Sequence, residues 1–263
     1  MLPNAWDVGS ARYLRHLGFV ALATTSGGFA FSRGLPDAEG AIPLDVMLSH
    51  VCEMVEATDL PVNADFESGY ARKPESVAAN VQRCIDAGAS GLSIEDLSGD
   101  RQRPIYDLSL AVARIEAVRA VIDDSGSGAV LTARAEPYSA RVGDPLAEAV
   151  RRLEAYAAAG ADVLYTPGPH DLDSIRVITE AVAPKPVNVL IGANVSFSVT
   201  ELAELGVRRV SVGSALSRAA WGGFDRAARE LFGGSFAGLD RAMPFDEVNG
   251  LFSAQRRSHR ATR

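Results

Sequence analysis

Short apolar segments alternate with longer amphipathic segments along the chain. The short segments are rich in Val, Ile, Leu and Ala and cover residues 19–25, 60–65, 91–95, 129–134, 162–166, 186–191 and 208–212. Such runs predict parallel strands that are buried on both faces. The longer segments carry apolar residues three or four positions apart, which predicts helices at residues 41–58, 73–87, 108–123, 145–159, 172–183, 198–205 and 217–232.

Glycines mark the ends of several predicted helices. Gly18, Gly88, Gly160 and Gly206 each stand between a helical pattern and the next apolar segment, where a glycine commonly ends a helix. The repeated order predicts successive βα units rather than separate domains. With residues 2–6 as a short first strand, the strands number eight, as a closed (β/α)8 TIM barrel requires.

We therefore expect an α/β fold in which residues 1–252 form a single barrel domain with a C-terminal helical segment. A length of 263 residues suits one such barrel. Residues 253–263 are basic and lack apolar periodicity, which favours a disordered tail over a phosphate or nucleic-acid contact. The net charge of −7 argues against a general nucleic-acid surface.

The sequence also bears on location and redox chemistry. No apolar run is long enough for a membrane span, and the N-terminus lacks the pattern of a secretory signal, so we expect a cytoplasmic protein without membrane contact. The two cysteines, Cys52 and Cys84, lie in amphipathic helical patterns. We interpret them as buried or half-buried thiols and exclude a disulfide framework.

Charged residues follow several of the predicted strands. Asp65 and Glu67 stand at the end of one strand, Glu95 at the end of the next and Arg134 at the end of a third. The carboxyl ends of all strands meet on one face of a barrel, so these side chains should converge there. Carboxylates beside one arginine suggest a divalent cation that holds a small anionic substrate. The alternative is that these acids cap helices or pair with Arg72 and Arg134.

Seven motifs occur in order along nearly the whole chain. They are Pro3-Asn-Ala-Trp-Asp7, Thr24-Thr-Ser-Gly-Gly28, Gly34-Leu-Pro-Asp37, Asp65-Phe-Glu-Ser-Gly-Tyr70, Ile94-Glu-Asp96, Ala133-Arg134 and Val210-Ser-Val-Gly-Ser214. Together they resemble the isocitrate lyase and phosphoenolpyruvate mutase superfamily. No single motif carries the resemblance.

The resemblance implies a metal site. Asp65 matches the residue that binds Mg²⁺ directly, with Mn²⁺ as a possible substitute, and Glu67 and Glu95 match the outer partners that hold the metal's water ligands. Mg²⁺ favours an oxygen shell and keeps several waters, so few carboxylates are needed. In this superfamily the metal polarises the substrate carbonyl and stabilises an enolate bound to it.

The resemblance also implies residues that contact the substrate. Thr25, Ser26 and Gly27 match a cradle for the substrate carboxylate, with an ordinary tight turn as the alternative. Arg134 matches a group that stabilises the departing charge, although it would also serve as a counter-ion to Glu95 or Glu136.

Three further polar residues are candidates for the same site. Asp37 matches an acid, base or positioning group near the substrate, or else forms a turn after proline. Asn188, at the end of the strand at 186–191, is expected to hydrogen-bond the far end of the substrate. His170 is the only histidine expected to approach the active face.

The loop at residues 97–106 departs from the superfamily's patterns. It lacks the Lys-Lys-Cys-Gly-His sequence of lyases that cleave isocitrate or 2-methylisocitrate, and it lacks the lysine and asparagine of the phosphonate enzymes. Arg101, Arg103 and Tyr106 are the candidates to replace those groups. The metal half of the chemistry is therefore retained, whereas the groups that select the leaving group in those enzymes are absent from this loop.

We expect a Mg²⁺-dependent lyase that makes or breaks a C–C bond beside a small 2-oxo-carboxylate, with an oxaloacetate-like or 2-hydroxy diacid substrate. The alternatives are a P–C mutase or hydrolase acting on a phosphonopyruvate-like substrate and an oxo-acid-binding barrel without catalysis. The apolar residues of the predicted helix at 217–232 and of segment 237–252 favour a homo-oligomer. The resemblance implies a homotetramer in which pairs of barrels exchange the eighth helix.

Overall fold

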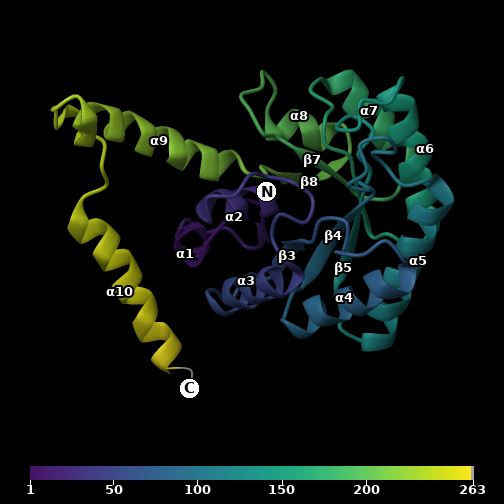
Figure 1. Ribbon diagram of the computed structural model, residues 1–263, viewed down its shortest axis with the longest axis horizontal. Helices are drawn as coiled ribbons and strands as arrows, with labels where there is room; N and C mark the ends of the chain where they lie inside the picture. The colour runs from purple at the N-terminus through teal and green to yellow at the C-terminus, as the bar shows by residue number, and fades with distance from the viewer. Residues whose placement is uncertain (262–263) are drawn as a thin grey trace.

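Eight parallel strands pair in the order in which they occur along the chain (Figure 1). The computed structural model describes residues 1–261. The strands are β1 Asn4–Ala5, β2 Leu22–Thr24, β3 Val62–Asp65, β4 Gly91–Glu95, β5 Val130–Arg134, β6 Val163–Tyr165, β7 Val187–Leu190 and β8 Val207–Ser211. A bridge between Leu2 and Ser211 brings the last strand to the first. The predicted (β/α)8 TIM barrel and all its strands are confirmed.

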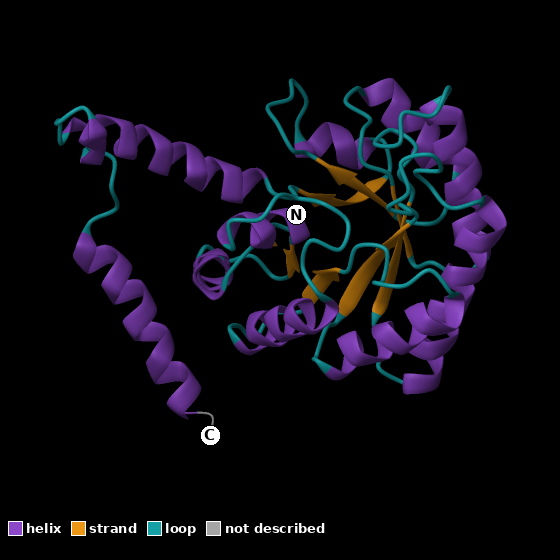
Figure 2. Cartoon of the chain, viewed as in Figure 1, coloured by secondary structure: helices purple, strands orange, loops and turns teal. Residues whose placement is uncertain are grey.

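Helices surround the strands (Figure 2). They are α1 Val8–His16, α2 Ser26–Ser32, α3 Leu44–Glu56, α4 Pro74–Asp86, α5 Leu108–Ser125, α6 Pro145–Ala158, α7 Leu172–Ala181, α8 Val199–Glu204, α9 Ala215–Phe232 and α10 Phe245–Ala261, with a 3-10 turn at Ala237–Leu239. Asp7, Asp144, Asp171 and Ser198 cap the N-termini of α1, α6, α7 and α8 by accepting a hydrogen bond from a first-turn N–H. The predicted alternation of helix and strand is therefore confirmed.

The apolar core lies between the strands and the surrounding helices. Leu92, Leu131 and Leu164 are fully buried on β4, β5 and β6 beneath helix residues such as Val118 and Leu153. Because side chains alternate along a strand, the neighbouring positions face the barrel interior. Those interior positions are largely polar, and the register aligns Asp65 with Ser93 and Glu95 with Arg134. Burial of one face thus directs the charged side chains of the other face toward a common interior.

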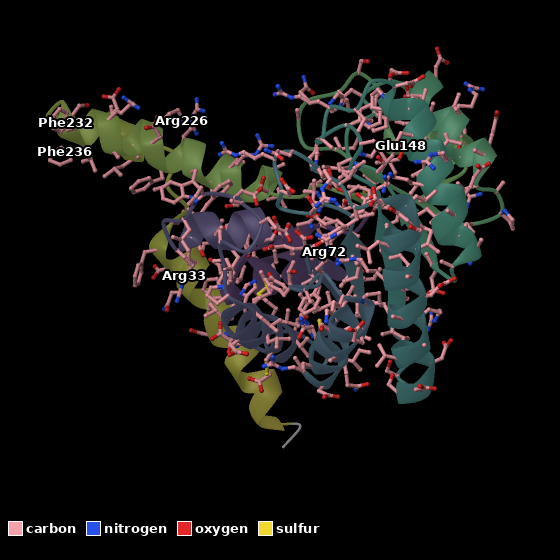
Figure 3. The ribbon with its side chains drawn as sticks, turned by 45° about the vertical axis from the view of Figure 1, so that its right-hand side comes forward. Arg33, Arg72, Glu148, Arg226, Phe232 and Phe236 are labelled. Atoms are coloured by element: carbon pink, nitrogen blue, oxygen red, sulfur yellow. The ribbon has the colours of Figure 1, made fainter. Side chains whose placement is uncertain are left out.

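Helix α9 extends away from the barrel, and α10 turns back from its outer end to contact α1 (Figure 1). Among the described residues of α9 only Ser217 is buried, whereas Trp221, Phe224 and Phe232 are 47%, 63% and 97% exposed. Phe232 and Phe236 lie at the outer end of this helix (Figure 3). The predicted helix at 217–232 is confirmed, but it leaves an apolar surface without cover within the described part of the chain.

Helix α10 differs from the expectation for the C-terminus. It continues to Ala261, so residues 253–261 are helical rather than a tail without regular structure. Ala, Gln and Arg in this stretch have high helix propensity, which outweighs the absence of an apolar period. Thr262 and Arg263 lie outside the described residues.

The structure also bears on membrane-spanning helices and on the two cysteines. Over residues 1–261, none of the helices combines the length and the apolar character needed to cross a membrane. Cys84 is buried and Cys52 half-buried, and both are free thiols, as predicted.

Candidate active site

One cavity of about 330 Å³ opens at the carboxyl ends of the strands. Nine of the candidates named from the sequence line it: Thr25, Ser26, Gly27, Asp37, Asp65, Glu67, Glu95, Arg134 and Asn188. These residues come from loops and strands spread over most of the chain. The barrel topology therefore assembles the set that the sequence motifs indicated.

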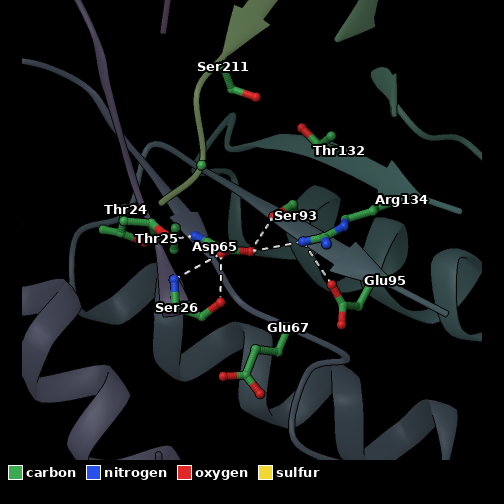
Figure 4. Close-up of polar contacts among 12 residues, drawn as sticks. Thr24, Thr25, Ser26, Asp65, Glu67, Ser93, Glu95, Thr132, Arg134 and Ser211 are labelled. Carbon is green, nitrogen blue, oxygen red and sulfur yellow. Dashed lines mark hydrogen bonds and ion pairs between the residues drawn. The ribbon is translucent and has the colours of Figure 1, made fainter. Parts of the chain in front are cut away.

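Asp65 stands at the centre of the cavity and is held by Ser26 (Figure 4). Its Oδ2 accepts hydrogen bonds from the backbone N and the Oγ of Ser26, each at 2.9 Å. Its Oδ1 makes only long contacts, 3.5 Å to Ser93 Oγ and 3.6 Å to Arg134 Nη1. One carboxylate oxygen is thus fixed by the protein, while the other faces Arg134 and the cavity.

The segment predicted as a carboxylate cradle is the start of a helix. Thr25 caps α2, and its side chain accepts a hydrogen bond from Gly28 N at 3.2 Å. A Cβ at Gly27 would lie 2.5 Å from Asp37 Oδ2, so only glycine allows Asp37 to approach this backbone. Burial, followed by the nearby charge of Asp65, raises the pKa of Asp37.

Arg134 joins three of the carboxylates. Its Nη1 lies 2.9 Å from Glu95 Oε2, and its Nε forms an ion pair with Glu136. Burial raises the pKa of Glu95 well above its usual value, although Arg134 opposes this rise. Arg134 is therefore a counter-ion to Glu95 and Glu136, and it also lines the cavity.

Glu67 and Glu39 line the same cavity. Glu67 has a left-handed backbone with φ of 48°, and its carboxylate accepts hydrogen bonds from Gly40 N and Tyr70 OH, both at 3.1 Å. Burial raises the pKa of Glu67 to about 7. Glu39 accepts a hydrogen bond from Ser68 Oγ, and burial raises its pKa as well. Sequence reasoning missed Glu39, although it follows Asp37 by two positions in the same loop.

The charges lining the cavity do not balance. Among the described residues, the cavity lining includes the acidic residues Asp37, Glu39, Asp65, Glu67, Glu95 and Glu136 but only two arginines, Arg134 and Arg209. Within the described residues no three carboxylate, imidazole or thiol groups form a ready metal cage. Mg²⁺ needs only one or two direct carboxylates because it keeps several waters. This donor set, acidic and rich in oxygen, therefore fits a hydrated divalent cation.

Several candidates do not reach the cavity. His170 is exposed and borders a separate shallow depression. Arg101 and Arg103 are exposed, and Tyr106 is buried beneath the guanidinium of Arg114 at 4.3 Å. The expectation that these residues replace the missing loop groups is not supported, because within residues 97–106 only Leu97 lines the cavity.

Asn188 lies deeper than predicted. It is the second residue of β7 rather than its end, because the strand begins at Val187 and stops at Leu190. Its amide donates to Ser211 Oγ at 2.9 Å and accepts from Arg209 Nε at 2.9 Å. Sequence reasoning missed Arg209, although the alternation of β8 places it on the inward face and Arg208 on the outward face.

Solved structures with this fold include several enzymes. A Burkholderia cenocepacia protein assigned as a lyase or mutase matches with a TM-score of 0.92 and 46% identity over 96% of this chain and 90% of the other. A 2,3-dimethylmalate lyase matches with a TM-score of 0.84 and 26% identity over 99% and 93%. Oxaloacetate acetylhydrolase with bound oxalate matches with a TM-score of 0.84 and 26% identity over 100% and 92%.

Proteins of similar sequence also include enzymes that are lyases or decarboxylases. An uncharacterized protein of Mycobacterium tuberculosis is 32% identical over 94% of this chain and 90% of its own length. The 2-methylisocitrate lyase of Escherichia coli is 30% identical over 74% of this chain and 67% of its own length. The oxaloacetate decarboxylase of Paraburkholderia xenovorans is 30% identical over 81% of this chain and 70% of its own length.

The family model for phosphoenolpyruvate phosphomutase matches residues 1–232, which include the whole barrel and α9. Enzymes of this superfamily use a divalent metal, in agreement with the acidic cavity. The chain therefore belongs to the phosphoenolpyruvate phosphomutase family, within the isocitrate lyase and phosphoenolpyruvate mutase superfamily.

Proposed function

We propose that this protein is a Mg²⁺-dependent lyase that makes or breaks the C–C bond beside the 2-oxo group of a small diacid such as an oxaloacetate-like acid. The observation that carries the proposal is the excess of carboxylates over arginines in the cavity around Asp65. A neutral or polyanionic ligand alone would leave that excess of negative charge uncompensated. A divalent cation with a small oxo-carboxylate satisfies it.

The residues divide between metal and substrate. Asp65 would hold the metal, and Glu67 and Glu95 would hold its waters. When bound, such a metal polarises a carbonyl oxygen and stabilises negative charge that develops there. Ser26 fixes Asp65 through two hydrogen bonds, so the position of the metal ligand depends on the start of α2.

The remaining groups would orient the substrate. Thr25, Ser26 and Gly27 form the wall on which the substrate carboxylate would lie, and the lack of a side chain at Gly27 permits a close approach. Asp37 lies directly over Gly27, in position to exchange a proton with a bound oxo acid or to orient it. Arg134, locked by Glu95 and Glu136, would stabilise the charge of the departing group.

The names of the relatives favour C–C chemistry over P–C chemistry. 2-Methylisocitrate lyase, oxaloacetate decarboxylase and 2,3-dimethylmalate lyase all act on small carboxylic acids. The family model and one solved neighbour, a phosphoenolpyruvate phosphomutase, support the P–C reaction as the second candidate. A barrel that binds an oxo acid without turnover is the third.

The proposal includes a homo-oligomer, with a tetramer of helix-exchanged dimers as the specific form. Helix α9 extends from the barrel with Trp221 and Phe224 exposed in an edge-to-face pair at 5.5 Å. Large apolar side chains that are exposed next to one another usually mark an interface. An identical subunit is the partner that such an exchange requires.

A substrate panel tests the reaction type. Wild-type protein with Mg²⁺ is incubated with 2-oxo acids, 2-hydroxy diacids and phosphonopyruvate, and pyruvate release and phosphorus NMR are followed. We expect metal-dependent consumption of a carboxylic diacid without formation of a new phosphorus species. Turnover of phosphonopyruvate alone would establish the second candidate, and binding without turnover across the panel would establish the third.

A further inference from the structure

A second arginine, Arg209, lies inside the barrel below the candidate metal site. It comes from β8, and its side chain crosses the interior to three other strands. Its Nη2 donates to Thr132 Oγ1 at 2.8 Å, and its Nε donates to Asn188 Oδ1 at 2.9 Å. Its Nη1 reaches Asn63 Oδ1 only at 3.5 Å, which is a weak hydrogen bond. One edge of the guanidinium is therefore poorly satisfied by the protein.

The charge of Arg209 has no acidic partner. No carboxylate among the described side chains lies within 4.0 Å of it, whereas Arg134 contacts several. Burial lowers the pKa of Arg209 to about 10, which still leaves the group cationic at neutral pH. A half-buried cation that faces only neutral oxygens is costly unless an anion joins it.

Arg209 and the metal-site residues share the same cavity. Asn63 and Thr132 precede Asp65 and Arg134 by two residues on β3 and β5, so their side chains lie on the same inward face. Two residues of strand correspond to about 7 Å, at roughly 3.3 Å per residue. Figure 4 shows Thr132 and Arg134 on the same strand, with the Arg134 side chain directed toward Asp65 and Glu95. A short diacid can span that separation.

We propose that Arg209 determines specificity at an anion subsite one layer below the candidate metal site, and that this subsite binds the distal carboxylate of a small dicarboxylic acid. The inference rests on the proposed function, because the metal end of the cavity would hold the oxo-acid end of the substrate. Asn188 becomes a positioning residue, since its amide oxygen orients the guanidinium. We therefore assign the contact with the far end of the substrate to Arg209 instead of Asn188.

Malate and lactate form a matched pair of probes, because they are stable 2-hydroxy acids that differ by the distal carboxylate. Binding of each to the full chain with Mg²⁺ is measured by calorimetry. We expect wild type to bind malate roughly 10- to 100-fold more tightly than lactate, as for one charged hydrogen-bonded contact. Arg209→Gln should reduce this ratio to about 1 without changing lactate affinity, whereas Arg209→Lys should keep part of it.

Arg208→Gln is the matched control, since Arg208 is exposed on the opposite face of the same strand and bonds only backbone oxygens. It should leave the ratio unchanged. Equal affinities of wild type for both acids, or a preference that survives Arg209→Gln, would overturn the subsite while leaving the metal-dependent reaction intact. Failure of both acids to bind wild type would overturn the subsite together with the proposed oxo-acid site. A substrate panel without turnover but with the malate preference would retain the subsite and remove only the catalytic proposal.

Discussion

His50 on α3 should make the stability of the fold sensitive to mild acid. Its ring is 3% exposed and stacks on Phe29 of α2 at 3.8 Å with an interplanar angle of 8°. Burial lowers the pKa of His50 from 6.5 to about 4, and the charge of Asp7 opposes the change only in part. Helix α2 begins at Ser26, so this stack supports the residue that holds Asp65.

The magnitude follows from the difference in protonation between the two states. Between pH 6.5 and pH 4 the unfolded chain binds a proton at His50 that the folded protein does not, so the free energy of unfolding falls as the pH falls. The contribution is complete above about pH 6.5 and is lost progressively toward pH 4. From pH 7.5 to pH 5.0 the loss from this one group is about 2 kcal/mol.

Urea denaturation at pH 7.5 and pH 5.0 measures this loss. Wild type should lose about 2 kcal/mol more than His50→Phe over this interval, because phenylalanine keeps the stacked ring and cannot bind a proton. The comparison uses the change with pH, so any constant cost of the substitution cancels. His170→Phe, at an exposed histidine, should retain the full loss of wild type. Equal losses in wild type and His50→Phe would refute the argument that burial of this imidazole governs the acid response.

Two further predictions concern the cavity and the extended helix. Arg134→Lys keeps the positive charge, but lysine lacks the planar guanidinium that pairs with Glu95 and Glu136 at the same time. The value of kcat/KM on the substrate that the panel identifies should therefore fall by about 100-fold, while Mg²⁺ affinity changes little. Full activity in Arg134→Lys would show that point charge alone is sufficient. The double substitution of Phe224→Asp and Phe232→Asp should lower the mass in sedimentation equilibrium to that of one chain, whereas Arg226→Asp on the same helix should not. A wild-type mass of one chain would contradict the exchanged-helix oligomer.

The barrel and its cavity were predictable because they depend on local patterns and one topological rule. Buried parallel strands read as apolar runs, and parallel strands bring their carboxyl ends to one face, so Asp65, Glu95 and Arg134 were placed together without tertiary information. Arg209 was within reach of the same reasoning, since alternation along β8 fixes its inward direction.

Other features depended on contacts that the sequence does not encode locally. Helix α2 contains two adjacent glycines, which have poor helix propensity, yet packing of Phe29 and Ala30 in the core stabilises it. The position of Glu39 depends on the path of its loop over Ser68. The direction of α9 away from the barrel does not follow from its amphipathic pattern alone.

Oxalate binding gives the most direct test of a divalent-metal site organised by Asp65, because oxalate mimics the planar enolate of pyruvate and does not depend on which bond is broken. Calorimetry is performed at fixed Mg²⁺ and after chelation, with wild type, Asp65→Asn and the exposed control Asp45→Asn. We expect saturable oxalate binding by wild type and Asp45→Asn only when Mg²⁺ is present, and a loss of at least about 100-fold in Asp65→Asn. Oxalate affinity that persists without metal, or that is unchanged in Asp65→Asn, would contradict the proposed role of Asp65.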